Sequence, residues 1–261
     1  MQLRKYRVRF GRIHNIFISH LHGDHVFGLY GLLSSMNLSG RESPIRLYAP
    51  SGFREILYSH LSDFDIHLNF DIDFTNLQGA QPVKIFEDKS ITVLAFPLKH
   101  RVPAFGFLFK EKEKERNILK EAIIKYDIPI SEIHKIKKGA DFFTGSGKLI
   151  PNKEITIDPS EPRSFAYCSD TKYFKRLSDF VRGVDLLYHE ATFAAGDKDL
   201  AEKTGHSTSE QAAIIAKDAG VGRLIIGHFS ARYKDVNLLL EEAKRIFPGT
   251  IAAQEGSVIT V

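Results

Sequence analysis

The chain has 261 residues, 43% of them hydrophobic, which is enough to bury a large core in one α/β unit. The single cysteine, Cys168, excludes an internal disulfide, and we expect a cytoplasmic protein. A formal net charge of +4 is compatible with nucleic-acid binding without requiring it, and no apolar run is long enough to predict a membrane span.

Predicted strands and helices alternate along most of the chain. Apolar, β-branched runs predict strands at residues 13–19, 45–48, 91–96, 105–109, 165–168, 184–188, 224–226 and 258–261. Helices are predicted at residues 27–36, 52–61, 210–219 and 236–246. This alternation is typical of an α/β fold.

The most informative segment, His20-Leu21-His22-Gly23-Asp24-His25, directly follows the first predicted strand. Three imidazoles and a carboxylate this close together must be solvated or partnered if they are buried, and a metal ion is a suitable partner. His20 and His22, two positions apart, can point into one zinc site while Asp24 and His25 turn toward a second. The alternative is a surface loop that happens to be rich in histidine.

Three further candidate ligands, His100, Asp170 and His228, each follow an apolar predicted strand. Each alone would more often be an ordinary polar residue at a strand end. With the first cluster they make a set of His and Asp side chains whose chemistry suits zinc. Four other histidines lack this context and are predicted to be ordinary core or surface residues: His14, His60, His67 and His134.

One long stretch, residues 110–163, interrupts the alternation of elements. It begins with a charged run at 110–116, continues with a predicted short amphipathic helix at 118–126, and includes a Gly-rich turn at 145–147. A connection of this length with weak regular structure usually has a function or is disordered. Its composition is equally compatible with a solvated excursion of mixed charge.

These motifs resemble the metallo-β-lactamase superfamily and, within it, the ribonuclease Z family. The likeness is carried by six segments in the family's order: residues 19–25, 98–107, 169–171, 189–193, 205–208 and 227–233. The resemblance implies one catalytic domain over residues 1–261, built as a four-layer αββα sandwich. It implies an endonuclease that trims the 3′ trailer from precursor tRNA, with residues 110–163 as an inserted arm that grips tRNA. It also implies a homodimer in which one subunit's arm presents tRNA to the other's site.

The resemblance further implies two Zn²⁺ ions per subunit, bridged by Asp170. The implied ligand sets are His20, His22 and His100 for the first ion, and Asp24, His25 and His228 for the second. Asp24 would also orient or deprotonate the attacking water.

A proton-delivery pair is implied as well. Glu190 would hold the imidazole of His206, whose imidazolium would protonate the leaving ribose 3′ oxygen. Ser230 and Arg232 would lie beside the scissile phosphate, because a planar guanidinium matches phosphate oxygens. The structural alternative for Glu190 is a carboxylate that orients a zinc-bound histidine. Ser207 is predicted to cap the helix that follows it.

The opening of the chain departs from the family pattern. Family members begin with a Gly-rich strand and turn, and then a second strand, all ahead of the position that matches Met1. We therefore expect an N-terminally shortened chain, with one sheet edge unpaired and the wall of the active site incomplete.

Two other functions fit the same residues. A small-molecule hydrolase of the same fold would act on an ester, thioester or lactone in a compact pocket, and it would have no use for residues 110–163. An N-terminally truncated, impaired homologue would bind RNA, or a sister subunit, without turnover.

Overall fold

The computed structural model describes residues 2–261, which divide into two compact units. The larger unit comprises residues up to 87, 92–109 and 164–261, and the smaller one comprises residues 88–91 and 110–163. The smaller unit therefore contains the whole of the predicted insertion. Among the described residues, no helix is both long and apolar enough to cross a membrane.

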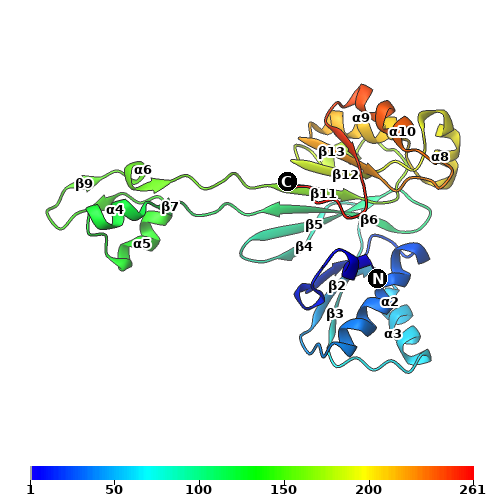
Figure 1. Ribbon diagram of the computed structural model, residues 1–261, viewed down its shortest axis with the longest axis horizontal. Coiled ribbons are helices and arrows are strands. Elements are labelled where there is room, and N and C mark those ends of the chain that lie inside the picture. The colour runs from blue at the N-terminus through cyan, green and yellow to red at the C-terminus, as the bar shows by residue number, and fades with distance from the viewer. Residues whose placement is uncertain (1) are drawn as a thin grey trace. The chain divides into compact units, whose positions relative to one another are not determined.

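The first sheet of the larger unit has three parallel strands, with helices packed on one face (Figure 1). Its strands, in spatial order, are β1 (Asn15–Phe17), β2 (Ile45–Pro50) and β3 (Ile72–Leu77). Helices α2 (Gly23–Leu38) and α3 (Phe53–Asp63) bury side chains such as Leu33, Phe53 and Leu57 against it. Strand β1 is an edge strand, because its ladder partner is β2.

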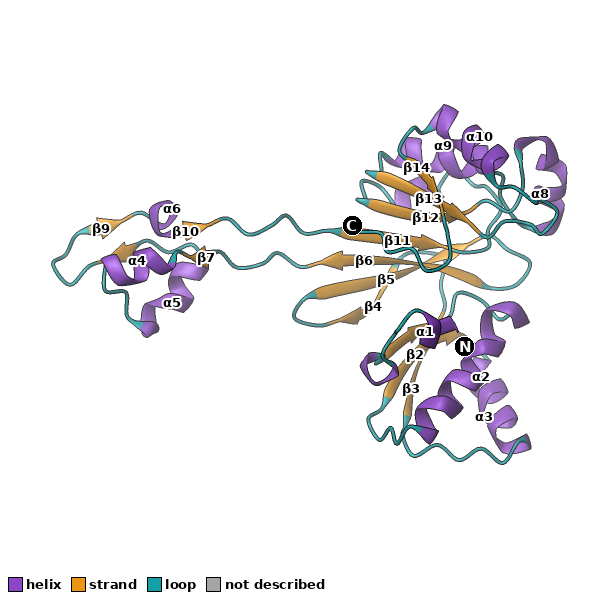
Figure 2. Cartoon of the chain, viewed as in Figure 1, coloured by secondary structure: helices purple, strands orange, loops and turns teal. Residues whose placement is uncertain are grey.

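The second sheet has seven strands (Figure 2), and the cluster of buried side chains around it is larger than the one on the first sheet. Its spatial order is β14 (Thr250–Ala252), β13 (Arg223–Gly227), β12 (Leu186–Glu190), β11 (Ser164–Cys168), β6 (Ala104–Glu111), β5 (Ile91–Leu98) and β4 (Val83–Glu87). Strands β11 to β14 run parallel to one another, and β4 is antiparallel to β5. Helices α7 (Leu177–Phe180), α9 (Ser209–Ala219) and α10 (Asn237–Ile246) belong to the same core.

The two sheets meet through aromatic side chains. The ring of Phe17 in β1 lies 5.3 Å from that of Phe107 and 5.4 Å from that of Phe109, both in β6. The backbone N–H of Phe105 donates to the carbonyl of Ser19 at 2.9 Å, immediately before the histidine cluster. The layers of the larger unit are therefore helix, sheet, sheet and helix, and the end of β1 lies against the second sheet.

The N-cap of helix α9 lies one residue later than the sequence predicts. Thr208, not Ser207, is the N-cap: its hydroxyl accepts from the N–H of Gln211, whose side chain returns a hydrogen bond to the Thr208 N–H. Ser207 is fully buried and donates to the carbonyl of Thr171 at 2.6 Å. The prediction for Ser207 is wrong because two overlapping capping sequences occur here, and tertiary contacts decide between them.

The predicted strand at residues 258–261 is also wrong. Val258 is 94% exposed, and Thr260 uses its carbonyl to accept from the guanidinium of Arg223 instead of a strand partner. A β-branched run forms a strand only where another strand offers its backbone, and here β14 pairs with β13. Elements outside the predictions include β3, β4, β14, α1 (Gln2–Lys5), α8 (Lys198–Thr204) and the short 3-10 turns η1 (Phe10–Arg12) and η2 (Ala195–Asp197).

The smaller unit has more regular structure than its sequence suggests. Its elements are β7 (Asn117–Ile118), α4 (Lys120–Lys125), α5 (Ile130–Lys137), β8 (Phe142–Phe143), β9 (Leu149–Ile150), α6 (Asn152–Ile155) and β10 (Thr156–Ile157). Ile136, Ile150 and Ile155 are fully or almost fully buried in a separate small core. The buried amide of Asn152 donates to the carbonyls of Ile136 and Ala140, both at 2.7 Å, and ties α6 to α5.

Candidate metal centre and catalytic site

The histidine cluster lies where the chain leaves β1 and enters α2. His22 directly precedes the helix, and Asp24 lies in its first turn. His20 is fully buried, and its Nδ1 lies 3.1 Å from the hydroxyl oxygen of Ser19. The ring centroid of His20 is 4.8 Å from that of His22 and 4.1 Å from that of His25. This short segment therefore gathers its three imidazoles in one place.

The other candidate ligands come from strand ends of the seven-stranded sheet. His100 follows β5, Asp170 follows β11 and His228 follows β13. The carboxylate of Asp170 is central: its Oδ2 lies 3.5 Å from Nε2 of His20 and 3.6 Å from Nε2 of His25. Its Oδ1 lies 3.4 Å from Nε2 of His228. Both sheets thus contribute side chains to one cluster around this carboxylate.

The potential ligand atoms form three overlapping groups, and within each group they lie within 4.8 Å of one another. The groups are His20, His22, His100 and Asp170; Asp24, His25 and His228; and Asp170, His206 and His228. The first two contain the same histidines as the two ligand sets expected from the resemblance. The third adds His206, which the sequence did not place among the ligands. The structure gathers all seven predicted ligands, and their assignment to particular ions stays a prediction.

The chemistry of this cluster fits a metal such as zinc. Nε2 of His20 is buried without a hydrogen-bond partner, which is costly unless a ligand meets it. Burial lowers the pKa of His20 to about 4 and also lowers the pKa of His100. Both imidazoles are therefore neutral at neutral pH, which is the form that binds a metal. Burial opposes ionisation of Asp170, but the surrounding imidazoles, led by His228, outweigh it and lower its pKa.

His228 occupies a strained turn directly after β13. Its φ of 60° lies in the left-handed region, which residues other than glycine rarely adopt. The turn is stabilised by a hydrogen bond from the N–H of Ser230 to the carbonyl of Thr192, at 3.0 Å. Gly227 lets the chain pass close to Tyr188, because a Cβ at this position would lie 2.5 Å from the tyrosine hydroxyl. This strained backbone conformation directs the His228 side chain toward Asp170.

Glu190, at the end of β12, forms a hydrogen-bonded pair with His206. Nδ1–H of His206 donates to Oε1 of Glu190 at 2.9 Å. The fully buried carboxylate also accepts from the N–H of Thr171 at 3.0 Å, the N–H of Thr192 at 3.0 Å and the Thr192 hydroxyl at 2.7 Å. Burial opposes protonation of His206, but the hydrogen bond to Glu190 outweighs it and raises its pKa. The pair therefore favours an imidazolium that is 13% exposed and can be reached from outside.

Sequence reasoning missed Thr171 and Thr192, which hold this pair. The only signal for Thr192 was its place in the segment 189–193 that carries part of the resemblance. The structural alternative for Glu190 also has a geometric basis, because its Oε2 reaches His228 through the Thr192 hydroxyl. Glu190 contacts His206 directly, whereas it reaches His228 only through the Thr192 hydroxyl.

Gly205, the residue after α8, contributes to the site through its backbone. Its φ is +82°, and its carbonyl accepts a hydrogen bond from Nδ1–H of His100 at 2.7 Å. This contact turns the ring so that Nε2 of His100 lies 3.2 Å from Nδ1 of His22. A Cβ at position 205 would lie 2.9 Å from Nδ1 of His100.

Gly205→Ala is therefore expected to weaken metal binding as well as stability. A left-handed alanine costs about 1–2 kcal/mol, and its methyl group would displace His100 from its carbonyl acceptor. Gly220→Ala is a matched control, because Gly220 ends α9 with a φ of +63° and has no atom within 4 Å of the added Cβ. The midpoint temperature of thermal unfolding should fall in both variants, whereas the affinity for zinc should fall only in Gly205→Ala. Equal zinc affinities would exclude a role for the Gly205 backbone in positioning His100.

The two residues expected beside a substrate phosphate lie in the loop after β13. The N–H of Arg232 contacts the Ser230 hydroxyl oxygen at 3.5 Å. The Arg232 guanidinium lies 3.4 Å from the carboxylate of Asp197 and 5.1 Å from the ring centroid of Phe193. Arg232 is thus engaged within the protein, and phosphate binding by Ser230 and Arg232 stays a prediction.

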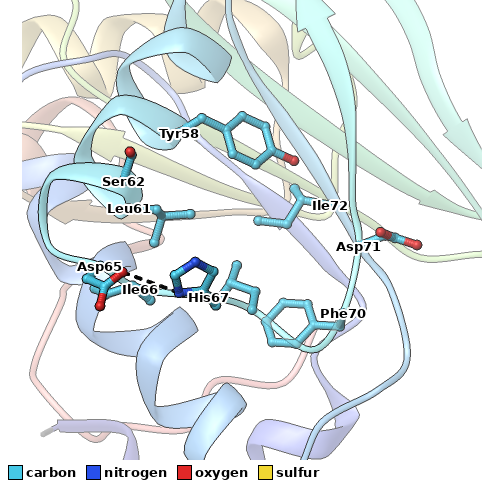
Figure 3. A pocket seen from close by; sticks show the side chains of 10 residues that line it. Tyr58, Leu61, Ser62, Asp65, Ile66, His67, Phe70, Asp71 and Ile72 are labelled. Atoms are coloured by element: carbon cyan, nitrogen blue, oxygen red, sulfur yellow. Dashed lines mark ion pairs between the residues drawn. The ribbon is translucent and has the colours of Figure 1, made fainter.

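A surface pocket of about 400 Å³ lies beside α3 and the start of β3 (Figure 3). Apolar side chains such as Leu61 and Phe70 line it, together with the exposed pair of Asp65 and His67, whose charged atoms are 3.7 Å apart. None of the seven candidate ligands lines this pocket, and neither Glu190 nor His206 does. The metal-site chemistry therefore lies elsewhere in the larger unit.

Comparisons with known proteins agree with this geometry. One family model, described as anti-Pycsar protein Apyc1, matches residues 1–113, and another, described as a beta-lactamase superfamily domain, matches residues 155–229. A protein named ribonuclease Z from Bacteroides thetaiotaomicron is 45% identical over 261 residues, covering all of this chain and 83% of that protein. The crystal structure of human tRNase Z, short form, matches with a TM-score of 0.66 at 26% identity, covering 99% of this chain and 83% of that chain.

A metallo-β-lactamase-fold protein from Bacillus subtilis matches with a TM-score of 0.64 at 18% identity, covering 96% of this chain and 78% of that chain. This likeness concerns the fold, and it confirms the metallo-β-lactamase architecture expected from the sequence. The resemblance to ribonuclease Z is confirmed by identity that extends over the whole chain. The chain therefore belongs to the ribonuclease Z family of metallo-β-lactamase-fold endonucleases.

Proposed function

We propose that this ribonuclease is zinc-dependent and removes the 3′ trailer from precursor tRNA by hydrolysing one phosphodiester bond. The observation that carries the proposal is the position of the Glu190–His206 pair beside the ligand cluster. Nδ1 of His206 lies 2.9 Å from Oε1 of Glu190 and 4.0 Å from Oδ2 of Asp170. The names ribonuclease Z and tRNase Z among the relatives support the same substrate class.

Two metal ions would be held by the histidines and carboxylates gathered from both sheets. The proposed sets are His20, His22 and His100 for one ion, and Asp24, His25 and His228 for the other, with Asp170 shared between them. When bound, zinc lowers the pKa of an attacking water and stabilises negative charge on phosphate oxygens. Asp24, whose side chain is 72% exposed, would accept or orient the proton of that water.

The leaving group needs an acid, because cleavage of the P–O3′ bond would otherwise release an alkoxide. As the water oxygen bonds to phosphorus, His206 gives the proton on Nε2 to the departing 3′ oxygen. Glu190 keeps Nδ1 of the same ring hydrogen-bonded and stabilises the imidazolium before transfer. The products are a 3′ hydroxyl on the tRNA and a 5′ phosphate on the trailer.

The decisive experiment is cleavage of a labelled precursor tRNA by zinc-loaded protein. We expect one cut just after the discriminator base, and loss of that cut after treatment with a chelator. Intact precursor alongside rapid hydrolysis of small esters or lactones would instead favour a small-molecule hydrolase. Tight RNA binding without turnover in the presence of zinc would favour an impaired homologue.

We also propose that the smaller unit is an arm that binds tRNA. Its separate core makes it a folded body rather than an unstructured excursion. Basic residues gather at the end of α5, where His134, Lys135 and Lys137 occupy the last turn and form ion pairs with glutamates that a phosphate would have to replace. Such side chains suit backbone phosphates.

Replacing residues 114–160 with a short Gly/Ser linker should therefore raise KM for precursor tRNA about tenfold or more, which is about 1.4 kcal/mol of lost binding. The variant keeps Glu111 and Arg163, whose side chains are 2.7 Å apart at the base of the segment. Hydrolysis of bis(p-nitrophenyl) phosphate should not change, because the arm is proposed to bind tRNA and that substrate contains none. An unchanged KM for tRNA would contradict the proposal.

We further propose a cytoplasmic homodimer in which one subunit's arm presents tRNA to the other subunit's site. Sedimentation analysis tests the dimer. A mixture of the arm-deleted variant with His206→Ala tests the presentation, since mixed dimers combine one intact arm with one intact opposite site. Recovery of a low KM for precursor tRNA on mixing supports the model, and mixed dimers that cleave no better than the arm-deleted variant alone contradict it.

A further inference from the structure

We propose that the hydroxyl of Thr192 is a positioning group, which fixes the orientation of the metal ligand His228 and of the proton-delivery pair Glu190 and His206. The inference rests on the assignment of His228 as a ligand under the proposed function. Thr192 is 7% exposed and follows β12 by two residues. Its Oγ1 lies 2.7 Å from Oε2 of Glu190 and 2.8 Å from Nδ1 of His228.

The direction of these two hydrogen bonds follows from the chemistry of the groups. A carboxylate only accepts hydrogen bonds, and a hydroxyl has one proton to give. The Thr192 proton therefore goes to Glu190, and the hydroxyl oxygen accepts from His228. Nδ1 of His228 must then carry its proton, which leaves the lone pair on Nε2. That Nε2 lies 3.4 Å from Oδ1 of Asp170, on the side of the ligand cluster.

One hydroxyl thus selects the tautomer of His228 that can bind a metal through Nε2. A partner on the second nitrogen is the usual way to fix the orientation of a metal-binding histidine. His228 has particular need of it, because its left-handed backbone is strained and its side chain is 30% exposed. The Thr192 backbone is itself held on this turn, since its carbonyl accepts from the N–H of Ser230 at 3.0 Å.

The same hydroxyl supports the acid side of the site. Oε2 of Glu190 has two donors, the Thr192 hydroxyl and the Thr192 N–H, while Oε1 is left for His206 and the N–H of Thr171. The rings of His206 and His228 stack with centroids 5.4 Å apart at 24°. Rotation of the Glu190 carboxylate or of the His228 ring would therefore disturb both imidazoles, and Thr192 opposes both motions.

Thr192→Val tests the proposal, because it removes the hydroxyl and nearly preserves the shape of the side chain. We expect the affinity for one zinc ion per subunit to fall about 10–100-fold, measured by competition with a chromogenic chelator. We expect kcat for precursor tRNA to fall as well, with little change in KM, because the arm is not altered. Thr192→Ser should restore most of both losses, since it returns the hydroxyl.

Thr250→Val is the matched control. Thr250 is 2% exposed and donates to the carbonyl of Phe247, so its replacement removes a buried hydroxyl without touching the site. Its zinc affinity and kcat should equal those of the unmodified enzyme. Wild-type zinc affinity in Thr192→Val would overturn the proposal, as would a Thr192→Ser variant no better than Thr192→Val.

A measurement on the unmodified protein gives an independent readout. Long-range ¹H–¹⁵N spectra should show His228 protonated at Nδ1, and protonation at Nε2 in the absence of metal would overturn the proposal even if the valine variant failed to fold. The variant His228→Ala tests separately whether His228 is a metal ligand, which the role of Thr192 requires. Full zinc content in His228→Ala would contradict the ligand assignment, whereas zinc loss there without zinc loss in Thr192→Val would contradict only the role of Thr192.

Discussion

Replacing His206 with alanine is expected to lower kcat for precursor tRNA cleavage about 10²–10⁴-fold, the contribution typical of a general acid. The ring is held by Glu190 at 2.9 Å and the pKa of His206 is raised despite burial, and under the proposed function this imidazolium protonates the departing 3′ oxygen. Both zinc ions should remain, because the seven proposed ligands are unchanged. Single-turnover cleavage and metal analysis measure the two effects.

A substrate with a good leaving group gives this prediction a sharper form. A p-nitrophenolate needs no proton on departure, so His206→Ala should keep most of its activity toward bis(p-nitrophenyl) phosphate. His60→Ala is the control histidine, because the ring centroid of His60 lies 3.8 Å from that of Tyr30 and His60 joins none of the candidate ligand groups among residues 2–261. Loss of zinc from His206→Ala would show instead that His206 is a ligand, as its grouping with Asp170 and His228 allows.

The ligand cluster could be anticipated from sequence because its signal is local. Each candidate is a His or Asp directly after a strongly apolar run, and parallel strands deliver their carboxyl ends to one edge of a sheet. The structure brings Asp170 and His228 together in this way from β11 and β13, which both run parallel to β12, and His100 joins them from the end of β5 in the same sheet. The alternation of strands and helices predicts only an α/β fold, whereas the four-layer αββα arrangement is implied by the family resemblance and is confirmed by the solved structures of similar fold.

The groups that position these side chains could not be anticipated, because their contacts depend on the tertiary structure. The carbonyl of Gly205 meets His100 across 105 positions of sequence, and nothing in a glycine indicates such a partner. Thr192 resembles any polar residue after a strand until His228 is seen beside it. The strand wrongly predicted at 258–261 shows the converse, because propensity without a neighbouring strand does not produce pairing.

The arm illustrates a third limit of sequence patterns. Its core is made of side chains such as Ile136, Ile150 and Ile155, which are scattered among charged residues and show no clear period. The predicted helix at 118–126 begins at Lys120 in the structure, because Ile118 pairs with Thr156 in a two-stranded ladder. A small core therefore forms from contacts that a search for long apolar runs does not detect.

Asp170→Asn is expected to have the larger effect on the metal centre. The carboxylate is 3% exposed and lies 3.4–3.9 Å from imidazole nitrogens of His20, His25, His100 and His228. An amide has nearly the same shape but carries no charge, and it turns an N–H donor toward nitrogens that should bind metal. Zinc affinity should therefore fall by more than the about 10–100-fold caused by residues that only orient ligands, and precursor cleavage should fall with it.

Asp185→Asn controls for the change from carboxylate to amide, because Asp185 accepts hydrogen bonds only from Ser164, at 2.7 Å, among the contacts described for its side chain. Chelator-treated unmodified enzyme should regain cleavage when zinc is returned, whereas Asp170→Asn should not regain it at the same zinc concentration. Two zinc ions bound to Asp170→Asn with unchanged affinity would contradict the shared-ligand model. The two histidine groups would then have to hold their ions independently, and the central position of Asp170 would need an explanation in proton transfer rather than in metal binding.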